Sequence, residues 1–363
     1  MDYMRVNEIN SSKDFMSLKE KWNELLQASQ HTVFSTFEWL ATWWKYFGHG
    51  RKLKLLTVED HGEIIAIAPL MYSIHKILGL RRGIIEFIGT PDSDYNNFII
   101  TKRHSECLKM FIDHLYEAPE NWECISLLDI PEKAECLQYL AQVSKTLKQV
   151  HQCPVLLLPS SYAEFLQNFN YNERRYFKRN MKRLERAFTV EFVDYSSPEK
   201  VNEGMHILFK LHQKRWQSKG FKGVFADSTT RNFHLELAKT FALKNWLCLY
   251  ALRLSGGVAA VDYGFRYNSK YYGYLTGFDP EYAYYSVGNL LRLFAIRKFI
   301  QEGIAEFDFL RGAEEYKERW NAVPRWNYQA VITRKGKIAT IQHWLYEHFW
   351  RQGNRLRYVL KIQ

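Results

Sequence analysis

The clearest chemical character in this sequence belongs to the basic side chains of one short segment, NERRYFKRNMKRLER, at residues 172–186. These side chains fall into two rows with helical spacing: Arg174, Lys178, Lys182 and Arg186 in one, and Arg175, Arg179 and Arg183 in the other. On an α-helix the two rows form one broad basic face. Such a face is expected to bind an anion, such as the phosphates of a nucleotide, a tRNA or a lipid surface. A solvated charged helix is the alternative.

A second candidate anion site is the loop that precedes the predicted helix NLLRLFAIRKFIQEG. The first backbone N–H groups of a helix have no internal partner and lie at the positive end of its dipole. A glycine at that place allows a phosphate to approach the backbone closely. The candidate phosphate-binding residues are therefore Ser286, Val287, Gly288 and Asn289. An ordinary turn with Ser286 as the helix N-cap explains the same residues without a ligand.

Four further residues could transfer protons. Asp262 lies inside the apolar strand VAAVDYGF, where a buried carboxylate is costly unless it is paired. Asp308 is at the end of a predicted strand, and Asp94 lies in a polar, turn-rich loop. Tyr285 offers a hydroxyl group beside Gly288. Each also has a structural explanation: an ion pair or edge strand for Asp262, a hydrogen bond for Asp308, a surface turn for Asp94 and core packing for Tyr285.

The elements that must position these residues occur twice in the chain. Residues 247–320 read as three strands joined by short turns, then a glycine loop, a helix and a strand. Residues 53–130 repeat this order, with the turn His61-Gly62 in the place of Ser255-Gly256-Gly257. Even the preceding helices correspond, since LKEKWNELL and LHQKRWQSK each contain a tryptophan. Two copies of one unit predict two similar domains with a ligand-binding cleft between them.

Length and composition agree with two domains. A chain of 363 residues exceeds one ordinary core, and we place the boundary so that the domains span 1–150 and 151–363. The five cysteines are scattered without a C-x-x-C pair, so they do not predict a metal site. The N-terminus lacks the pattern of a signal peptide, and no apolar stretch is long enough to span a bilayer, so we expect a cytoplasmic protein.

Taken together, these motifs resemble the GNAT acyltransferases, and in duplicated form the FemAB-type and CelD-like (BioF2-like) acetyltransferase-like proteins. The resemblance covers nearly the whole chain and rests on FEWLATWWKYFG, IAIAPL, Ser93-Asp94-Tyr95, LHQKRW, GFDPEY, SVGNLL and above all FDFLRGAEEYKERW. It implies an α/β fold of two tandem GNAT-like domains, each with a mixed, mostly antiparallel sheet flanked by helices. It also implies transfer of an acetyl or acyl group from acyl-CoA to an amine or hydroxyl, often of a cell-envelope, polysaccharide or other small-molecule acceptor.

The resemblance also suggests roles for individual residues. Asp94, Asp262, Asp308 and Tyr285 become the candidate catalytic groups, and Lys317 joins residues 286–289 as a donor-binding residue. The acceptor or an anion would contact Tyr95, Arg175, Arg179, His212, Arg215 and Trp216. Simple packing is the alternative for His212. No metal is expected, because the sequence contains neither H-x-x-x-H nor H-E-x-x-H.

This sequence departs from the GNAT pattern at the phosphate loop, where Tyr285 and Leu290 replace the usual Arg or Gln and the second Gly or Ala. The first copy has PDSDYNN there, so we expect it to serve the acceptor while the second copy binds the donor. An aminoacyl-tRNA-dependent, FemX-like ligase is one alternative, with the tRNA on the basic helix 174–186. A non-catalytic anion- or polysaccharide-binding protein of the same fold is another.

Several functions are disfavoured by missing motifs. No G-x-S-x-G, P-loop or dinucleotide-binding glycine motif occurs, and nothing predicts sequence-specific DNA binding. The C-terminal segment HWLYEHFWRQGNRLRYVLKIQ mixes aromatic and basic residues. It is expected to dock on the preceding domain, and peripheral membrane contact is the alternative.

Overall fold

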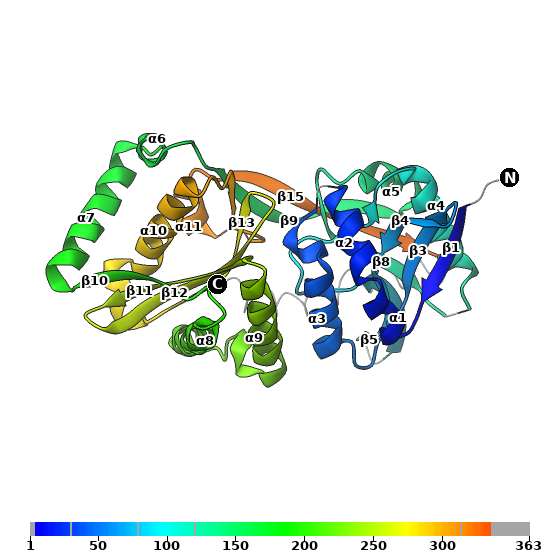
Figure 1. Cartoon of the computed structure of the whole chain (residues 1–363), viewed down its shortest axis with the longest axis horizontal. Coiled ribbons are helices and arrows are strands. Elements are labelled where there is room, and N and C mark those ends of the chain that lie inside the picture. Colours follow the sequence, from blue (N-terminus) through cyan, green and yellow to red (C-terminus); the bar gives the residue numbers. More distant parts are fainter. Residues whose placement is uncertain (1–3, 30, 78–79, 120, 313, 335–363) are drawn as a thin grey trace. The chain divides into compact units, whose positions relative to one another are not determined.

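The computed structural model describes residues 4–29, 31–77, 80–119, 121–312 and 314–334, and they divide into two compact units (Figure 1). Unit 1 runs to His151 and also takes up the chain from Trp326, whereas unit 2 is Gln152–Arg325. The first boundary lies beside the expected one. The strand that follows Arg325 lies with unit 1 rather than with the second domain, because it pairs with a strand of unit 1. The C-terminal segment considered for membrane contact lies outside the described residues.

Unit 1 contains two sheets and five α-helices among its described residues. One sheet has the order β1-β3-β4-β7, and β2, β5, β6, β8 and β15 belong to the other. The strands are β1 (Met4–Ile9), β2 (Lys52–Leu53), β3 (Leu55–Asp60), β4 (Glu63–Ala68), β5 (Leu70–Ile77), β6 (Leu80–Phe87), β7 (Ile99–Ile100), β8 (Cys124–Pro131) and β15 (Val323–Thr333). The helices are α1 (Ser12–Ser17), α2 (Lys19–Gln27), α3 (Phe37–Phe47), α4 (His104–Glu117) and α5 (Cys136–Val143), with a short 3-10 turn η1 (Val33–Ser35).

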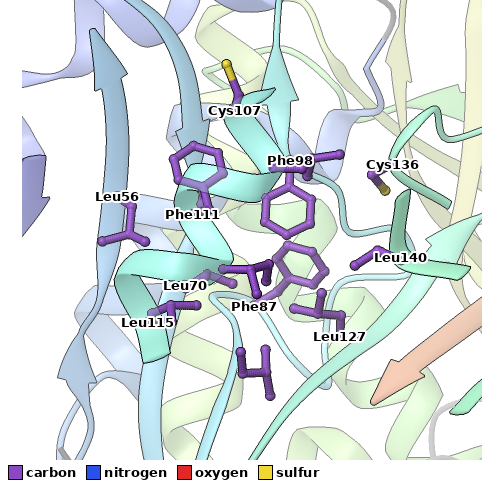
Figure 2. Close-up of a cluster of buried hydrophobic side chains, with 14 of the residues drawn as sticks. Leu56, Leu70, Phe87, Phe98, Cys107, Phe111, Leu115, Leu127, Cys136 and Leu140 are labelled. Carbon is purple, nitrogen blue, oxygen red and sulfur yellow. The ribbon is translucent and has the colours of Figure 1, made fainter. Parts of the chain in front are cut away.

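The core of unit 1 lies between helix α4 and the strands beneath it (Figure 2). Phe111 and Leu115 from α4 meet Phe87 from β6 and Leu127 from β8, and all four side chains are at most 1% exposed. Phe98 and Phe111 are stacked with ring centroids 5.9 Å apart. Seven of the eight residues of β8 are buried, so this strand is covered on both of its faces.

Unit 2 contains the strands β9 (Thr146–Leu157, its first part in unit 1), β10 (Val190–Asp194), β11 (Leu247–Leu254), β12 (Gly257–Tyr267), β13 (Lys270–Phe278) and β14 (Glu306–Asp308). They are ordered β10-β11-β12-β13-β14-β9. The helices are α6 (Tyr162–Gln167), α7 (Tyr171–Ala187), α8 (Val201–Gln217), α9 (Ser228–Leu243), α10 (Val287–Gln301) and α11 (Glu315–Glu318), with 3-10 turns η2 (Val224–Ala226) and η3 (Pro280–Tyr285).

Helices cover both faces of the unit 2 strands (Figure 1). Tyr263 and Phe265 of β12 contact α9, since Tyr263 lies 5.7 Å from His234 and Phe265 lies 5.1 Å from Phe241 between ring centroids. On the other face Tyr271 of β13 stacks on a ring of α10, 4.3 Å away. Helix α8 approaches β13 closely at Gly277, where an added Cβ atom would lie 2.7 Å from a backbone nitrogen of the helix.

The two units repeat one construction, as the sequence predicted. Each begins with three antiparallel strands, β1-β3-β4 in unit 1 and β10-β11-β12 in unit 2. Both hairpins close through two residues with positive φ, His61-Gly62 and Ser255-Gly256. Both also carry a bulge at the same distance after the turn, at Ile65 and Ala259. In both, a later strand then adds in parallel: β8 beside β6, and β14 beside β13.

Two further properties of the described chain bear on function. None of its helices has the length and apolar composition needed to cross a bilayer. All five cysteines are buried, and none of them forms a disulfide.

Candidate functional site

The predicted basic helix is α7, which extends from Tyr171 to Ala187. Its first turn is capped by Asn170, whose side chain accepts a hydrogen bond from the backbone of Glu173 at 3.0 Å. Phe177 and Leu184 are buried against the rest of unit 2 and fix which side of the helix faces inward. The basic residues therefore lie on the remaining surface, where most of them are exposed.

This basic surface borders an open hollow of about 600 Å³, which we call the basic hollow. Its lining consists of Arg175, Lys178, Arg179, Lys182, Arg183, Arg186, Ala187 and Tyr285. Arg183 connects α7 to the turn η3, because its guanidinium carbon lies 4.2 Å above the ring of Tyr284 and its Nη1 donates to the Tyr284 carbonyl at 3.4 Å. The basic helix predicted from the sequence thus lines this hollow together with Tyr285, the residue directly before the predicted loop 286–289.

Helix α10 begins directly after this hollow. Ser286 occupies the N-cap position in the left-handed region (φ 57°), and its side chain makes no capping hydrogen bond. Ser286 is therefore the N-cap residue, as predicted, but it does not cap the helix through its side chain. Its carbonyl accepts from the amides of Asn289 and Leu290, whereas Val287 and Gly288 stand before the first helical bond, so their N–H groups have no acceptor within the helix. An added Cβ atom on Gly288 would meet only Phe278, at 4.0 Å, so the glycine leaves open space there.

Asn289 and Tyr285 attach the start of α10 to its neighbours. The Asn289 amide donates to the Tyr176 hydroxyl of α7 at 3.2 Å, and the Tyr285 ring packs on Phe188 at 5.2 Å. Tyr285 is thus partly packed while also lining the basic hollow. These contacts hold the start of α10 beside α7.

The strands β13 and β14 separate just beyond their shared start. They pair only from Lys270 to Tyr272 and from Glu306 to Asp308, although β13 continues to Phe278. Arg215 of α8 reaches the free part of β13, where its Nη1 donates to the Thr276 carbonyl at 3.1 Å and its guanidinium carbon lies 4.8 Å above the Phe278 ring. Phe278 is also the nearest neighbour of Gly288, so Arg215 lies close to the start of α10.

Asp262 is buried on β12, which is an inner strand of its sheet, and it forms no ion pair with any described residue. Its carboxylate accepts hydrogen bonds from the hydroxyls of Tyr271 at 2.6 Å and Thr276 at 2.7 Å, and it is 3% exposed. Burial raises the pKa of Tyr271 well above its usual value, and the charge of Asp262 adds to this effect, so the phenol remains a proton donor to the carboxylate. The arrangement joins β12 to β13 across the sheet.

Asp308 and Lys317 stabilise the chain that leaves β14. Asp308 is 3% exposed and accepts a hydrogen bond from the backbone of Leu310 at 2.8 Å. The Lys317 ammonium is equally buried and donates to three backbone carbonyls, each at 3.1 Å, belonging to Leu310, Arg311 and Gly312. It also pairs with Glu314 at 2.9 Å. Lys317, assigned to the donor phosphates by resemblance, is thus committed to this turn.

His212 and Trp216 of α8 contact each other in the interior, each 1% exposed. The Trp216 indole donates to His212 Nε2 at 2.9 Å, which places the ring proton on Nδ1. Burial, with the charge of Arg215 adding to it, lowers the pKa of His212 to about 3. The imidazole is therefore neutral near pH 7. Because His212 and Trp216 are both enclosed, neither side chain is exposed to make the contact with an acyl acceptor that the resemblance had suggested.

This burial predicts a dependence of stability on pH. The unfolded chain binds a proton on His212 below about pH 6.5 whereas the folded chain does not until about pH 3, so acidification favours unfolding. The free energy of unfolding should fall by about 2 kcal/mol between pH 6.5 and 5 through this residue alone. His212→Gln keeps an acceptor for Trp216 and removes the titration. Chemical denaturation at several pH values should give a shallower profile for the variant, and parallel profiles would contradict the assignment.

Asp94 and Tyr95 belong to unit 1, whereas the other candidate residues lie in unit 2. Both are buried, and the Asp94 carbonyl accepts a hydrogen bond from Asn327 of β15 at 2.7 Å. Sequence reasoning missed the neighbouring Asp129, which is fully buried with φ 61° and bonded to His151 Nδ1 at 2.6 Å. These contacts fix the end of β8 in unit 1.

Comparisons with known proteins agree with this geometry. The family model described as an acetyltransferase (GNAT) domain matches residues 172–318, which include α7, the start of α10 and the separating strands. Residues 172–318 are a GNAT domain. No curated protein sequence matches the chain.

Solved structures resemble the chain in fold over most of its length. The alignment with the crystal structure of FemX covers 91% of this chain and 97% of the FemX chain, at 12% identity and with a TM-score of 0.62. The L-PGS structure from Bacillus licheniformis covers 90% and 95% at 11% identity, with a TM-score of 0.57. A conserved protein of unknown function from Bacteroides thetaiotaomicron covers 91% and 100% at 10% identity, with a TM-score of 0.58. At these identities the likeness shows the fold: a tandem GNAT-like arrangement of mixed α/β units.

The GNAT domain thus combines a basic hollow, a helix whose first amides have no acceptor within that helix, and separating strands within one unit. These features suit a transferase that holds a phosphorylated carrier and presents the group attached to it. Among the described residues, no three His, Cys, Asp or Glu side chains come together as a possible metal site.

Proposed function

We propose that this protein transfers an acetyl or other acyl group from acyl-CoA to an amine or hydroxyl of a small-molecule, polysaccharide or cell-envelope acceptor. The observation that carries this proposal is the basic hollow, which six Lys and Arg side chains of α7 line together with Tyr285, two residues before α10 begins. The GNAT fold and the matched domain support a transferase; the donor and the acceptor are the proposal.

The donor fits because its charge and size correspond to the hollow. The phosphates of coenzyme A would bind the N–H groups of Val287 and Gly288, where a helix favours an anion, and the cations of α7 would neutralise the remaining charge. A hollow of about 600 Å³ lies within the range of small-molecule pockets. The acyl arm would then extend toward Phe278, where β13 has no parallel neighbour and its backbone can bond the acyl carbonyl.

A second candidate donor is an aminoacyl-tRNA. The exposure of Arg175, Lys178, Arg179, Lys182 and Arg186 along α7 favours it, because a row of exposed cations suits a long polyanion. The resemblance in fold to FemX also supports it. The proposals differ in the salt dependence of binding: a tRNA that contacts several phosphates would lose affinity steeply as salt rises.

Gly288→Ala tests the acyl-CoA proposal with two opposite expected effects. The ligand-free chain has room for the methyl group, and alanine favours a helix, so stability should rise by about 0.5–1 kcal/mol. A diphosphate on the backbone would collide with that methyl group, so we expect the affinity for acetyl-CoA to fall by about tenfold or more, equivalent to at least about 1.4 kcal/mol. Calorimetry with acetyl-CoA, longer acyl-CoAs and charged tRNA would measure this.

Each result of that titration has a distinct meaning. Saturable binding of acyl-CoA that weakens in Gly288→Ala supports the proposal. Binding of tRNA alone supports the second candidate. No binding of either donor would reject transfer from both and leave a non-catalytic anion-binding protein on this fold.

A further inference from the structure

Arg292 is a buried cation for which the described chain provides no polar partner. It lies in the second turn of α10 and is only 7% exposed. No hydrogen bond or ion pair to its guanidinium occurs among the described residues, and its Nε is completely enclosed without an acceptor. Buried charges in proteins are normally paired, so the structure leaves this charge without its usual complement.

Aromatic rings surround the guanidinium group instead. Its central carbon lies 4.8 Å above the ring of Tyr316, 5.6 Å from that of Phe309 and 5.8 Å from that of Trp320. Such contacts stabilise the charge through the ring faces but give the N–H groups no acceptor. The indole N–H of Trp320 is also buried without an acceptor, which is unusual for a tryptophan. Two neighbouring donors thus lack the same kind of partner.

The position of Arg292 connects this cluster to the donor site. Arg292 follows Gly288 by four residues, so both lie on one face of α10, a single turn apart. Gly288 borders Phe278, whose ring carries the guanidinium of Arg215. Burial lowers the pKa of Arg215, and the charge of Arg292 lowers it further, while Tyr316 and Glu314 oppose this effect. The two arginines therefore interact electrostatically, although they come from helices on opposite faces of the sheet.

We propose that Arg292, with Arg215 beside it, binds a carboxylate carried by the transferred acyl group or by the acceptor. This proposal rests on the proposed function, since it places the carboxylate one helical turn beyond the carrier's phosphates. A planar carboxylate matches the fork of N–H donors on a guanidinium group. A phosphate dianion would lose more hydration in this aromatic surrounding, and the open amides and the cations of α7 already provide for phosphate.

The test compares CoA, acetyl-CoA and succinyl-CoA by calorimetry on the full chain, with wild type, Arg292→Met and Arg297→Met. Arg297 is the matched control, because it lies on the same helix, is exposed and contacts the ring of Tyr162 at 5.5 Å. We expect wild type to bind succinyl-CoA about 10- to 100-fold more tightly than acetyl-CoA. The preference should disappear in Arg292→Met and persist in Arg297→Met. This result would place the carboxylate on the transferred group.

A second arm examines the acceptor. Free succinate and N-acetylglycine are titrated into wild type and Arg292→Met, each with and without saturating CoA. Binding by wild type that is lost in the variant would place the carboxylate on the acceptor. Because this arm also runs without CoA, it tests the arginine site even if every CoA species fails to bind and the proposed function falls.

Two outcomes would overturn the inference. One is that wild type and Arg292→Met bind every carboxylate ligand with the same affinity. The other is that Arg292→Met lowers the affinity for CoA as much as that for succinyl-CoA, which would assign Arg292 to the diphosphate. Circular dichroism would verify folding of each variant. Should Arg292→Met unfold, Arg292→Lys is used in its place: it keeps the charge but loses the planar fork, so the succinyl preference should fall by about tenfold.

Discussion

Replacing Arg175, Arg179 and Lys182 together by glutamine should weaken donor binding by about 100-fold. All three side chains line the basic hollow and are exposed, so their loss should not disturb the apolar side of α7. Each charge-assisted contact to a phosphate on such a surface contributes about 1 kcal/mol after solvent screening, and three contacts give about 3 kcal/mol. Calorimetry with the acyl-CoA that binds best would measure the change.

The matched control replaces Lys210, Lys222 and Lys239 by glutamine. These residues are also exposed and lie in unit 2, but none lines the basic hollow. Both variants lose three positive charges, so a general effect of net charge would weaken donor binding equally in both. Equal affinities for the two triple variants would show that α7 does not contact the donor. If the donor is a tRNA, the first variant should also show a smaller dependence of affinity on salt.

The sequence predicted most of this fold because the pattern of each unit is local. The turns His61-Gly62 and Ser255-Gly256 stand between runs of apolar residues, and such dipeptides close hairpins. The basic rows of 174–186 also predicted α7 correctly, since their spacing has the period of a helix. The assignment of β15 was less predictable. Pairing of β15 with β8 joins residues about 200 positions apart, and nothing local in either strand specifies it.

The candidate site was predicted in part, and the differences follow from burial. Spacing alone indicated that Arg175 and Gly288 could bind anions, but not that Tyr285, close before Gly288, lines the same hollow as Arg175. The sequence also did not show that Lys317 and His212 are enclosed. A polar residue in a motif gives the same sequence pattern whether it binds a ligand or bonds to the protein itself. Arg292 was missed, although a cation between Leu291 and Leu293 on an apolar helix was a visible signal.

Replacing Asp262 by alanine should lower the free energy of unfolding of unit 2 by about 3–5 kcal/mol. The change removes the acceptor of the buried hydroxyl group of Tyr271 and the partly buried hydroxyl group of Thr276, and it leaves a small cavity. Each unsatisfied buried donor costs about 1–3 kcal/mol. The melting temperature of a unit of this size should fall by roughly 10 °C, which differential scanning calorimetry would detect.

Asp262→Asn separates a structural role from a catalytic one. Its amide has one acceptor and one donor group, and a rotating hydroxyl can accept where it formerly donated, so the loss should be only about 1 kcal/mol. Both carboxylate oxygens already accept hydrogen bonds from the β12–β13 pair and the side chain is 3% exposed, so a direct proton transfer from an acceptor is sterically disfavoured. We therefore expect the asparagine variant to keep its donor affinity and most of its transfer rate. A rate reduced by about 100-fold or more in a stable variant that still binds donor would make Asp262 the proton acceptor instead.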